Sequence, residues 1–210
     1  MPPLNSIIAD PLKVPTFNFE HQRLTSQLHS HLTILKAAPS SHALSLFENS
    51  TASKIGSASY RVASDAYNKA AIDVRMSTSL SDLRDLRNDT LDMGKRAASL
   101  MSKSSEKPLE IHSGMSKVRV ASKLRAEFAS NYQLRLAYYI GTVRGWQLNK
   151  NSQKGWLLSS SHDLDDTCDD NENQGLISVF DFFQSGDMYP PAHLGCVCNL
   201  YLYLKKDNKR

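Results

Sequence analysis

The segment LAYYIGTVRGWQLNKNSQKGWLL, residues 136–158, is where the pattern of the sequence changes. Up to Trp146, apolar residues recur every three or four positions, which is the spacing of one face of an α-helix. The turn-forming residues of NKNSQKG end that pattern, and GWLL then starts a short apolar run of the length of a strand. The segment therefore predicts that a long helix is followed by a region of different structure.

Upstream of this segment, apolar stripes predict a helical domain over residues 59–150. The last helix is the best defined, with a stripe made of Leu124, Phe128, Tyr132, Leu136, Ile140, Val143 and Trp146. An earlier helix carries Tyr60, Ala63, Tyr67, Ala70 and Val74 on one face. Between them, Ser79 followed by Asp82 resembles a capping box and predicts the start of another helix, which Pro108 ends.

The first 58 residues have a mixed character and are predicted to form a separate N-terminal segment. Prolines keep the start extended, and residues 17–38 have the apolar spacing of a helix. Residues 38–59 are rich in serine, which predicts a loop with a short helical turn.

Downstream, residues 151–204 predict a small β-rich module, followed by a charged tail at residues 205–210. GWLLSSS is a candidate strand, LISVFDFF a second strand or a short helix, and CVCNLYLYL alternates as a strand does. The acidic stretch HDLDDTCDDNENQG between them predicts a loop. The fold class expected is therefore α+β, with a mainly α-helical body of long helices followed by a small β-rich C-terminal module.

The amino-acid composition and charge limit the classes of protein to which the chain can belong. Of 210 residues, 40% are hydrophobic and 22% charged, and no apolar run approaches the roughly 18 residues of a membrane span, so no membrane partner is expected. The start of the chain lacks a secretory signal, so we expect a protein made in a cytoplasm. Eight acidic and no basic residues lie between Ser161 and Asp187, which leaves a balance of +12 elsewhere. Such a positive body is consistent with a polyanionic partner such as nucleic acid, or with an acidic protein surface, but the preferred interpretation is that Lys and Arg solvate exposed helix faces.

Three cysteines and one histidine form the candidate metal ligands. His193, Cys196 and Cys198 follow an H-x-x-C-x-C spacing, and Cys168 lies upstream of them. Three thiols and one imidazole are a ligand set that zinc favours, and a module with few large apolar residues commonly needs a metal or a staple. The alternative is that the cysteines are buried reduced thiols and that His193 is a turn residue.

The C-terminal part of the sequence resembles the signature of the phage head-morphogenesis or minor capsid protein family, relatives of the phage Mu F protein. The resemblance covers about residues 120–204. The matching residues, in order, are Arg125, Ala126, Glu127, Trp146, Cys168, Gly175, Gly186, Pro190, Pro191, His193, Cys196 and Cys198. Leu194, Val197 and Asn171 depart from the pattern, since many members have proline, arginine and cysteine there.

This resemblance implies a minor structural protein of a tailed-phage head, located in the virion at the portal or the head interior and acting in head assembly. Its partners would be portal or capsid proteins of the same virion, and the basic helical body would face the portal, scaffold or packaged DNA. A DNA-binding internal virion protein is an overlapping alternative.

An enzymatic alternative uses some of the same residues. His162, Asp163, Asn171 and His193 are the residue types with which a His-Asn-His nuclease holds a divalent ion and activates water. The chain has no phosphate-binding loop, no dinucleotide-binding motif and no nucleophile elbow. A structural or binding role is therefore the main expectation, and no catalytic residue is assigned.

Overall fold

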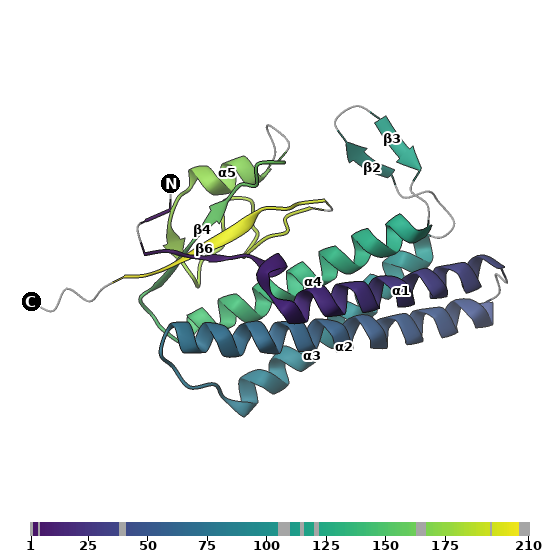
Figure 1. Ribbon diagram of the computed structural model, residues 1–210, viewed down its shortest axis with the longest axis horizontal. Helices are drawn as coiled ribbons and strands as arrows, with labels where there is room; N and C mark the ends of the chain where they lie inside the picture. Colours follow the sequence, from purple (N-terminus) through teal and green to yellow (C-terminus); the bar gives the residue numbers. More distant parts are fainter. Residues whose placement is uncertain are drawn as a thin grey trace, which may run out of the picture.

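The computed structural model describes residues 2–3, 5–37, 41–104, 110–113, 116–119, 122–162, 167–193 and 195–205. Long helices form an elongated bundle, and a small antiparallel sheet lies against one end of it (Figure 1). The helices of the bundle are α1 (Pro15–Ala37), α2 (Ser41–Asp73), α3 (Leu80–Ser104) and α4 (Ser122–Gln147). The predicted α+β class, helical first and β-rich at the C-terminus, is confirmed.

The sheet contains strands from both ends of the chain. Its order is β1-β6-β4-β5, and every neighbouring pair is antiparallel. The strands are β1 (Ile7–Ala9), β4 (Ser152–Leu157), β5 (Ile177–Ser178) and β6 (Asn199–Leu204). The short helix α5 (Thr167–Asn173) lies above the sheet in Figure 1, on the side away from the bundle.

Two smaller elements connect the main ones. The 3-10 helix η1 (Pro11–Lys13) leads from β1 into α1, and its Asp10 cap accepts a hydrogen bond from the Leu12 N–H. The hairpin of β2 (Glu110–Ser113) and β3 (Ser116–Arg119) lies between α3 and α4 in the sequence. It stands apart from the sheet in Figure 1.

Local sequence signals explain where several helices begin and end. The Ser79 hydroxyl accepts a hydrogen bond from the Asp82 N–H at 3.0 Å, so the predicted cap at the start of α3 is confirmed. Pro15 stands at the start of α1, where its missing N–H costs nothing. The predicted end of α3 at Pro108 lies outside the described residues.

The loop predicted over residues 38–59 is wrong, because α2 already begins at Ser41. Serine has a weak helix preference, but the apolar residues of this stretch recur at helical spacing and are buried against the bundle. They continue the stripe of the same helix, and those buried in the core are Phe47, Ile55, Ala58 and Val62. Burial of these apolar residues therefore outweighs the weak helix preference of serine. The α2 helix runs unbroken through residue 58, the predicted boundary between the N-terminal segment and the helical domain.

Glycines let α2 approach its neighbours closely. A Cβ atom at Gly141 of α4 would overlap the carbonyl oxygen of Ala63 in α2. A Cβ atom at Gly94 of α3 would overlap the carbonyl oxygen of Ala52, which is also in α2. The α2 helix is thus the centre of the bundle, with backbone-to-backbone contact on two sides.

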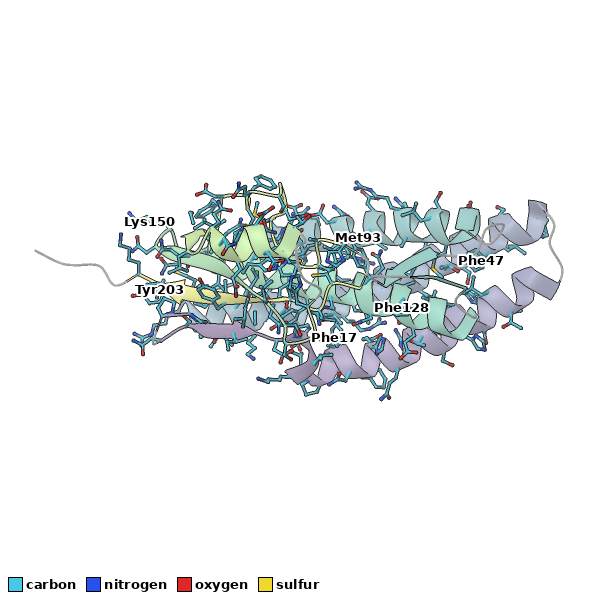
Figure 2. The ribbon with its side chains drawn as sticks, turned by 90° about the horizontal axis from the view of Figure 1, so that it is seen from above. Phe17, Phe47, Met93, Phe128, Lys150 and Tyr203 are labelled. Carbon is cyan, nitrogen blue, oxygen red and sulfur yellow. The ribbon has the colours of Figure 1, made fainter. Side chains whose placement is uncertain are left out.

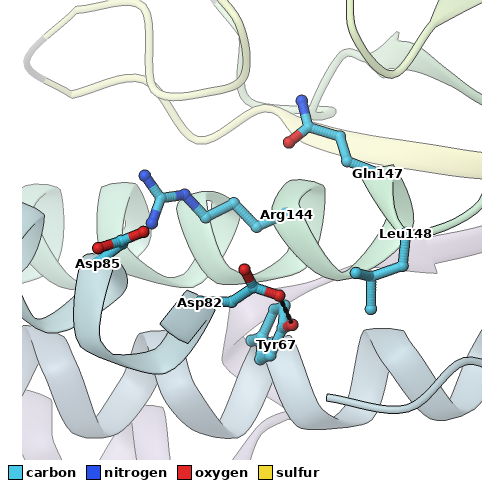
Figure 3. Close-up of a pocket in the computed structure, with 6 residues that line it drawn as sticks. All are labelled: Tyr67, Asp82, Asp85, Arg144, Gln147 and Leu148. Atoms are coloured by element: carbon cyan, nitrogen blue, oxygen red, sulfur yellow. Dashed lines mark hydrogen bonds between the residues drawn. The ribbon is translucent and has the colours of Figure 1, made fainter. Parts of the chain in front are cut away.

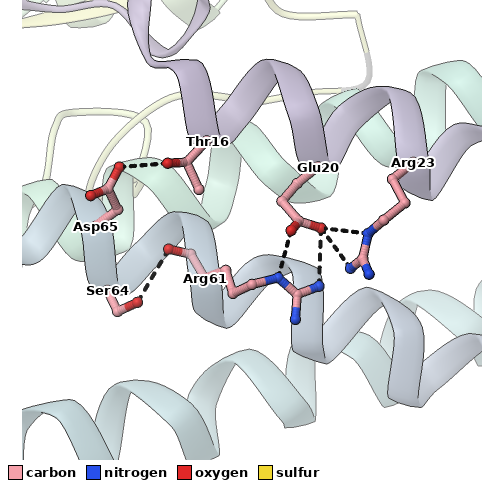
Figure 4. A network of polar contacts seen from close by, with 6 residues as sticks. All are labelled: Thr16, Glu20, Arg23, Arg61, Ser64 and Asp65. Atoms are coloured by element: carbon pink, nitrogen blue, oxygen red, sulfur yellow. Dashed lines mark hydrogen bonds and ion pairs between the residues drawn. The ribbon is translucent and has the colours of Figure 1, made fainter.

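A buried carboxylate joins α1 to α2 (Figure 4). Glu20 is 2% exposed and accepts hydrogen bonds from Arg61 at 2.5 and 3.0 Å and from Arg23 at 2.7 Å. Nearby, the Thr16 hydroxyl donates to Asp65 at 2.9 Å. These contacts fix the start of α1, and with it the path of the preceding strand β1 into the sheet.

The sheet packs its apolar face on the bundle and closes the core. Trp156, Leu200 and Leu202 are at most 1% exposed. In the view of Figure 2, Phe47 lies toward one end of the molecule, and Lys150 and Tyr203 lie at the other end, where the sheet is. Because β1 pairs with β6, the C-terminal sheet is completed by the N-terminal segment.

Candidate metal centre

Three elements bring the predicted ligands together. Cys168 is in the first turn of α5, Cys198 directly precedes β6, and His193 and Cys196 are in the loop between α5 and β6. The Sγ atom of Cys168 is 3.7 Å from the Sγ atom of Cys196 and 3.7 Å from the Nε2 atom of His193. All three cysteines are buried and form no disulfide. The predicted set of one histidine and three cysteines therefore meets in one place.

His162 is a candidate ligand that the sequence reasoning did not include. Its Nδ1 atom is 3.9 Å from the Sγ atom of Cys198, and its side chain is 7% exposed. In the part of the chain that the structure describes, two groups have metal-ligand spacing, His162–Cys168–Cys198 and Cys168–His193–Cys196, and they share Cys168. The only signal in the sequence was a histidine six residues before a cysteine, which is too weak to single out.

The distances within each of the two groups match those between ligands of a tetrahedral ion. With zinc–sulfur bonds of about 2.3 Å and zinc–nitrogen bonds of about 2.0 Å, tetrahedral angles place two sulfurs about 3.8 Å apart and a sulfur and a nitrogen about 3.6 Å apart. The observed separations are 3.7 Å between the sulfurs of Cys168 and Cys196, and 3.7 and 3.9 Å for the two sulfur–nitrogen pairs. These residues can therefore bind a metal ion.

A carboxylate orients one imidazole of the cluster. The Nε2 atom of His162 is 3.0 Å from the Oδ2 atom of Asp169, while its Nδ1 atom faces the thiols. Metal-binding histidines commonly donate their second ring N–H to a carboxylate, which fixes the tautomer and leaves the other nitrogen free for the ion. His162 and Asp169 have this arrangement.

The thiols are too close together for all of them to ionise without a cation. The pKa of Cys196 is lowered, because the thiols of Cys168 and Cys198 donate hydrogen bonds to its sulfur. The pKa of Cys168 is raised, first by its hydrogen bond with Cys196 and then by that with Cys198. A divalent ion among the three sulfurs would supply the positive charge that three thiolates need.

A tight turn places His193 and Cys196 on the same side of their loop. The Cys196 N–H donates to the His193 carbonyl oxygen at 3.1 Å. Gly195, inside this turn, has a φ of +91°, a conformation that side chains other than glycine rarely adopt. The H-x-x-C spacing is thus the spacing of a turn, and it explains why a glycine precedes Cys196.

The acidic stretch predicted as a loop is partly helical, which corrects the sequence prediction. Its residues 167–173 form α5, and Cys168 and Asn171 are buried on one side of that helix. Asn171, a candidate nuclease residue, is fully buried, and its side-chain oxygen accepts the Ser185 N–H at 3.2 Å. Asp163, another candidate, lies outside the described residues.

A second candidate site is a hollow of about 270 Å³ lined by residues of α2, α3 and α4 (Figure 3). Its lining residues are Tyr67, Asp82, Asp85, Arg144, Gln147 and Leu148. The Tyr67 hydroxyl donates to Asp82 at 2.6 Å, and burial, with this hydrogen bond, raises the pKa of Tyr67 to about 12. Arg144 pairs with Asp89. Two of the charged side chains that line the hollow, Asp82 and Arg144, therefore already have partners within the protein, and the Cys/His cluster is the better candidate site.

Comparison of the chain with protein-family models, with curated proteins and with solved structures finds no match in any of the three. Among the described residues, no helix is both long and apolar enough to cross a membrane.

Proposed function

We propose that the chain is a minor structural protein of a tailed-phage head, in which a zinc ion holds the C-terminal module in shape for docking on a larger assembly. The observation that carries the proposal is the cluster of three buried thiols and two imidazoles. It joins the end of β4, helix α5 and the start of β6, the segments that the resemblance to head-morphogenesis proteins emphasises.

The chemistry of the cluster favours a structural ion over a catalytic one. Cys168, Cys196 and Cys198 with one of the two histidines make four protein ligands, which is a closed tetrahedral set. A catalytic zinc keeps a coordination position for water or substrate, and these thiols are at most 5% exposed. When bound, the zinc ion would supply a cross-link between the three segments, and no reaction step is assigned to it.

The module has a physical need for such a cross-link. Of its strands, β5 has two residues and β1 has three, so strand pairing holds the sheet edges weakly. Within the described residues of the long path from Leu158 to Cys198, the regular elements are α5 and β5. An ion bound by residues at three points of this segment would cross-link it and hold its shape without additional helices or strands.

Metal content is the first experiment. Elemental mass spectrometry of the purified chain is expected to find about one zinc ion per molecule. Cys196→Ser is expected to lose the ion and to melt at a lower temperature, while the matched control His29→Ala, at an exposed position on α1, keeps both. Comparing His162→Ala with His193→Ala shows which imidazole is the ligand. Zinc-free wild-type protein with unchanged melting of the cysteine variant would refute the metal centre.

The head-protein role needs its own experiment. The chain would be co-expressed with portal and capsid proteins of a tailed phage, and assembled heads would be tested for its presence by mass spectrometry. We expect incorporation at low copy number by the wild type and its loss in Cys196→Ser. DNA binding that weakens steeply with salt would instead favour the internal DNA-binding role, and DNA nicking with magnesium or manganese would favour the nuclease.

A further inference from the structure

Arg135 is a buried cation without an acidic partner among the described residues. It lies in the middle of α4 and is 2% exposed. One Nη atom donates to the Cys198 carbonyl oxygen at 2.6 Å and, at 3.3 Å, to the side-chain oxygen of Asn199. Its Nε atom is buried and has no hydrogen-bond partner. All of these acceptors are neutral, although buried arginines are normally paired with an anion.

The hydrogen bonds of Arg135 lead to the candidate metal cluster. The shortest of them is to the backbone of Cys198, whose thiol belongs to the cluster. Three thiolates and one neutral imidazole around a divalent ion carry a net charge of −1. One guanidinium cancels that charge, so the filled centre and Arg135 together are neutral.

We propose that Arg135 is the counter-charge of the metal centre, and that it holds the Cys198 backbone in the position that the ion requires. This inference rests on the proposed metal site and adds a positioning residue from the helical body. It also explains how α4 is coupled to the cluster, since the ion and the guanidinium stabilise each other.

The structure offers a neutral comparison at the same carbonyl group. The Tyr139 hydroxyl is 3.4 Å from the Cys198 carbonyl oxygen and 2.8 Å from the Asn199 side-chain oxygen, one helical turn beyond Arg135. Tyr139→Phe therefore removes a hydrogen bond from this backbone without removing a charge. Arg144→Met, on the same helix, removes a charge that pairs with Asp89 away from the cluster.

The test measures zinc affinity by competition with a chromogenic chelator, using the full chain. Arg135→Met is expected to weaken zinc binding by roughly 10- to 100-fold, the usual effect of removing a group that supports a metal ligand. Arg135→Lys keeps the charge and is expected to restore most of the affinity. Tyr139→Phe should have a smaller effect, and Arg144→Met none.

A second readout separates support of the metal centre from packing. Since Arg135→Met is expected to bind zinc more weakly, zinc should raise its melting temperature by less than it raises that of the wild type. In the zinc-loaded protein the same change should lower the melting temperature. Equal losses in the metal-free and zinc-loaded forms, or equal zinc affinity of the Met variant and the wild type, would overturn the proposal. Failure of the wild type to bind zinc would overturn the metal centre itself. If the metal-free chain does not fold, the zinc affinities of Arg135→Met and Arg135→Lys test the proposal by themselves.

Discussion

Lys154 is a buried amine in the middle of β4, and it makes the stability of the protein dependent on pH. Its side chain is fully buried, with the Nζ atom 2.7 Å from the Met188 carbonyl oxygen and 5.2 Å from the centre of the Phe183 ring. Burial lowers the pKa of Lys154 from 10.5 to about 8. Since the unfolded chain binds this proton more tightly, the charged lysine opposes folding below pH 8, and stability rises as pH increases from about 8 toward 10.5.

The size of the effect follows from the two pKa values. A difference of about 2.5 pKa units corresponds to a destabilisation of about 3 kcal/mol when the amine is fully charged. Linkage predicts that about 2 kcal/mol of this is recovered between pH 7.5 and pH 9.5. Lys154→Met removes the charge and keeps an unbranched side chain, so the variant should lack this part of the pH dependence.

Urea unfolding of wild type and variant at several pH values measures this directly. The difference in unfolding free energy between Lys154→Met and the wild type should be largest near pH 7.5 and should shrink by about 2 kcal/mol at pH 9.5. Taking the difference removes contributions from tyrosines and thiols, which titrate in both proteins. Lys150→Met, at an exposed turn position, should show no such trend. A difference that stays constant over this range would refute the reasoning.

Three further predictions concern the bundle and the cluster. Gly141→Ala should lower the unfolding free energy by about 1–3 kcal/mol in urea unfolding, although alanine is the better helix former, because its Cβ overlaps the Ala63 carbonyl; a more stable variant would contradict this contact. Glu20→Gln should cost about 1–3 kcal/mol by the same assay, since Arg61 and Arg23 lose their shared anion; an unchanged midpoint would show that solvent replaces it. Zinc should dissociate as pH falls, because protons compete for the thiolates, and a chelator dye should detect its release; retention at low pH would argue against thiolate ligands.

Side chains of the helical body bind directly to the segment that carries the candidate metal ligands. Arg135 and Tyr139 of α4 both donate to the Cys198 carbonyl oxygen, and Tyr139 also donates to the Ala9 carbonyl oxygen of β1 at 3.1 Å. One face of α4 therefore connects the cluster, the last strand and the first strand. Binding of a metal ion is expected to tighten this whole junction.

Much of the architecture can be predicted from the sequence because it depends on local patterns. Apolar residues every three or four positions predict α4, a serine cap followed by aspartate predicts the start of α3, and alternation predicts β6. The ligands Cys168, His193, Cys196 and Cys198 could also be named, since thiols are few and their spacing is unusual. These helices, this strand and these candidate ligands can be predicted from residue type and apolar periodicity alone.

Other features depend on contacts between segments far apart in the chain. The serine-rich start of α2 is helical because its apolar residues are buried against α1 and α4. His162 becomes a candidate ligand because Asp169 and Cys198 lie on either side of its ring.

The sequence by itself therefore determined most of the long helices, the strand β6 and the candidate metal ligands Cys168, His193, Cys196 and Cys198, through local periodicity and residue chemistry. Only the tertiary structure decided that β1 completes the C-terminal sheet, that Arg135 lies buried beside the cluster, and that His162 faces the thiols. These last features come from long-range packing and from the cost of burying charge, neither of which leaves a local pattern in the sequence.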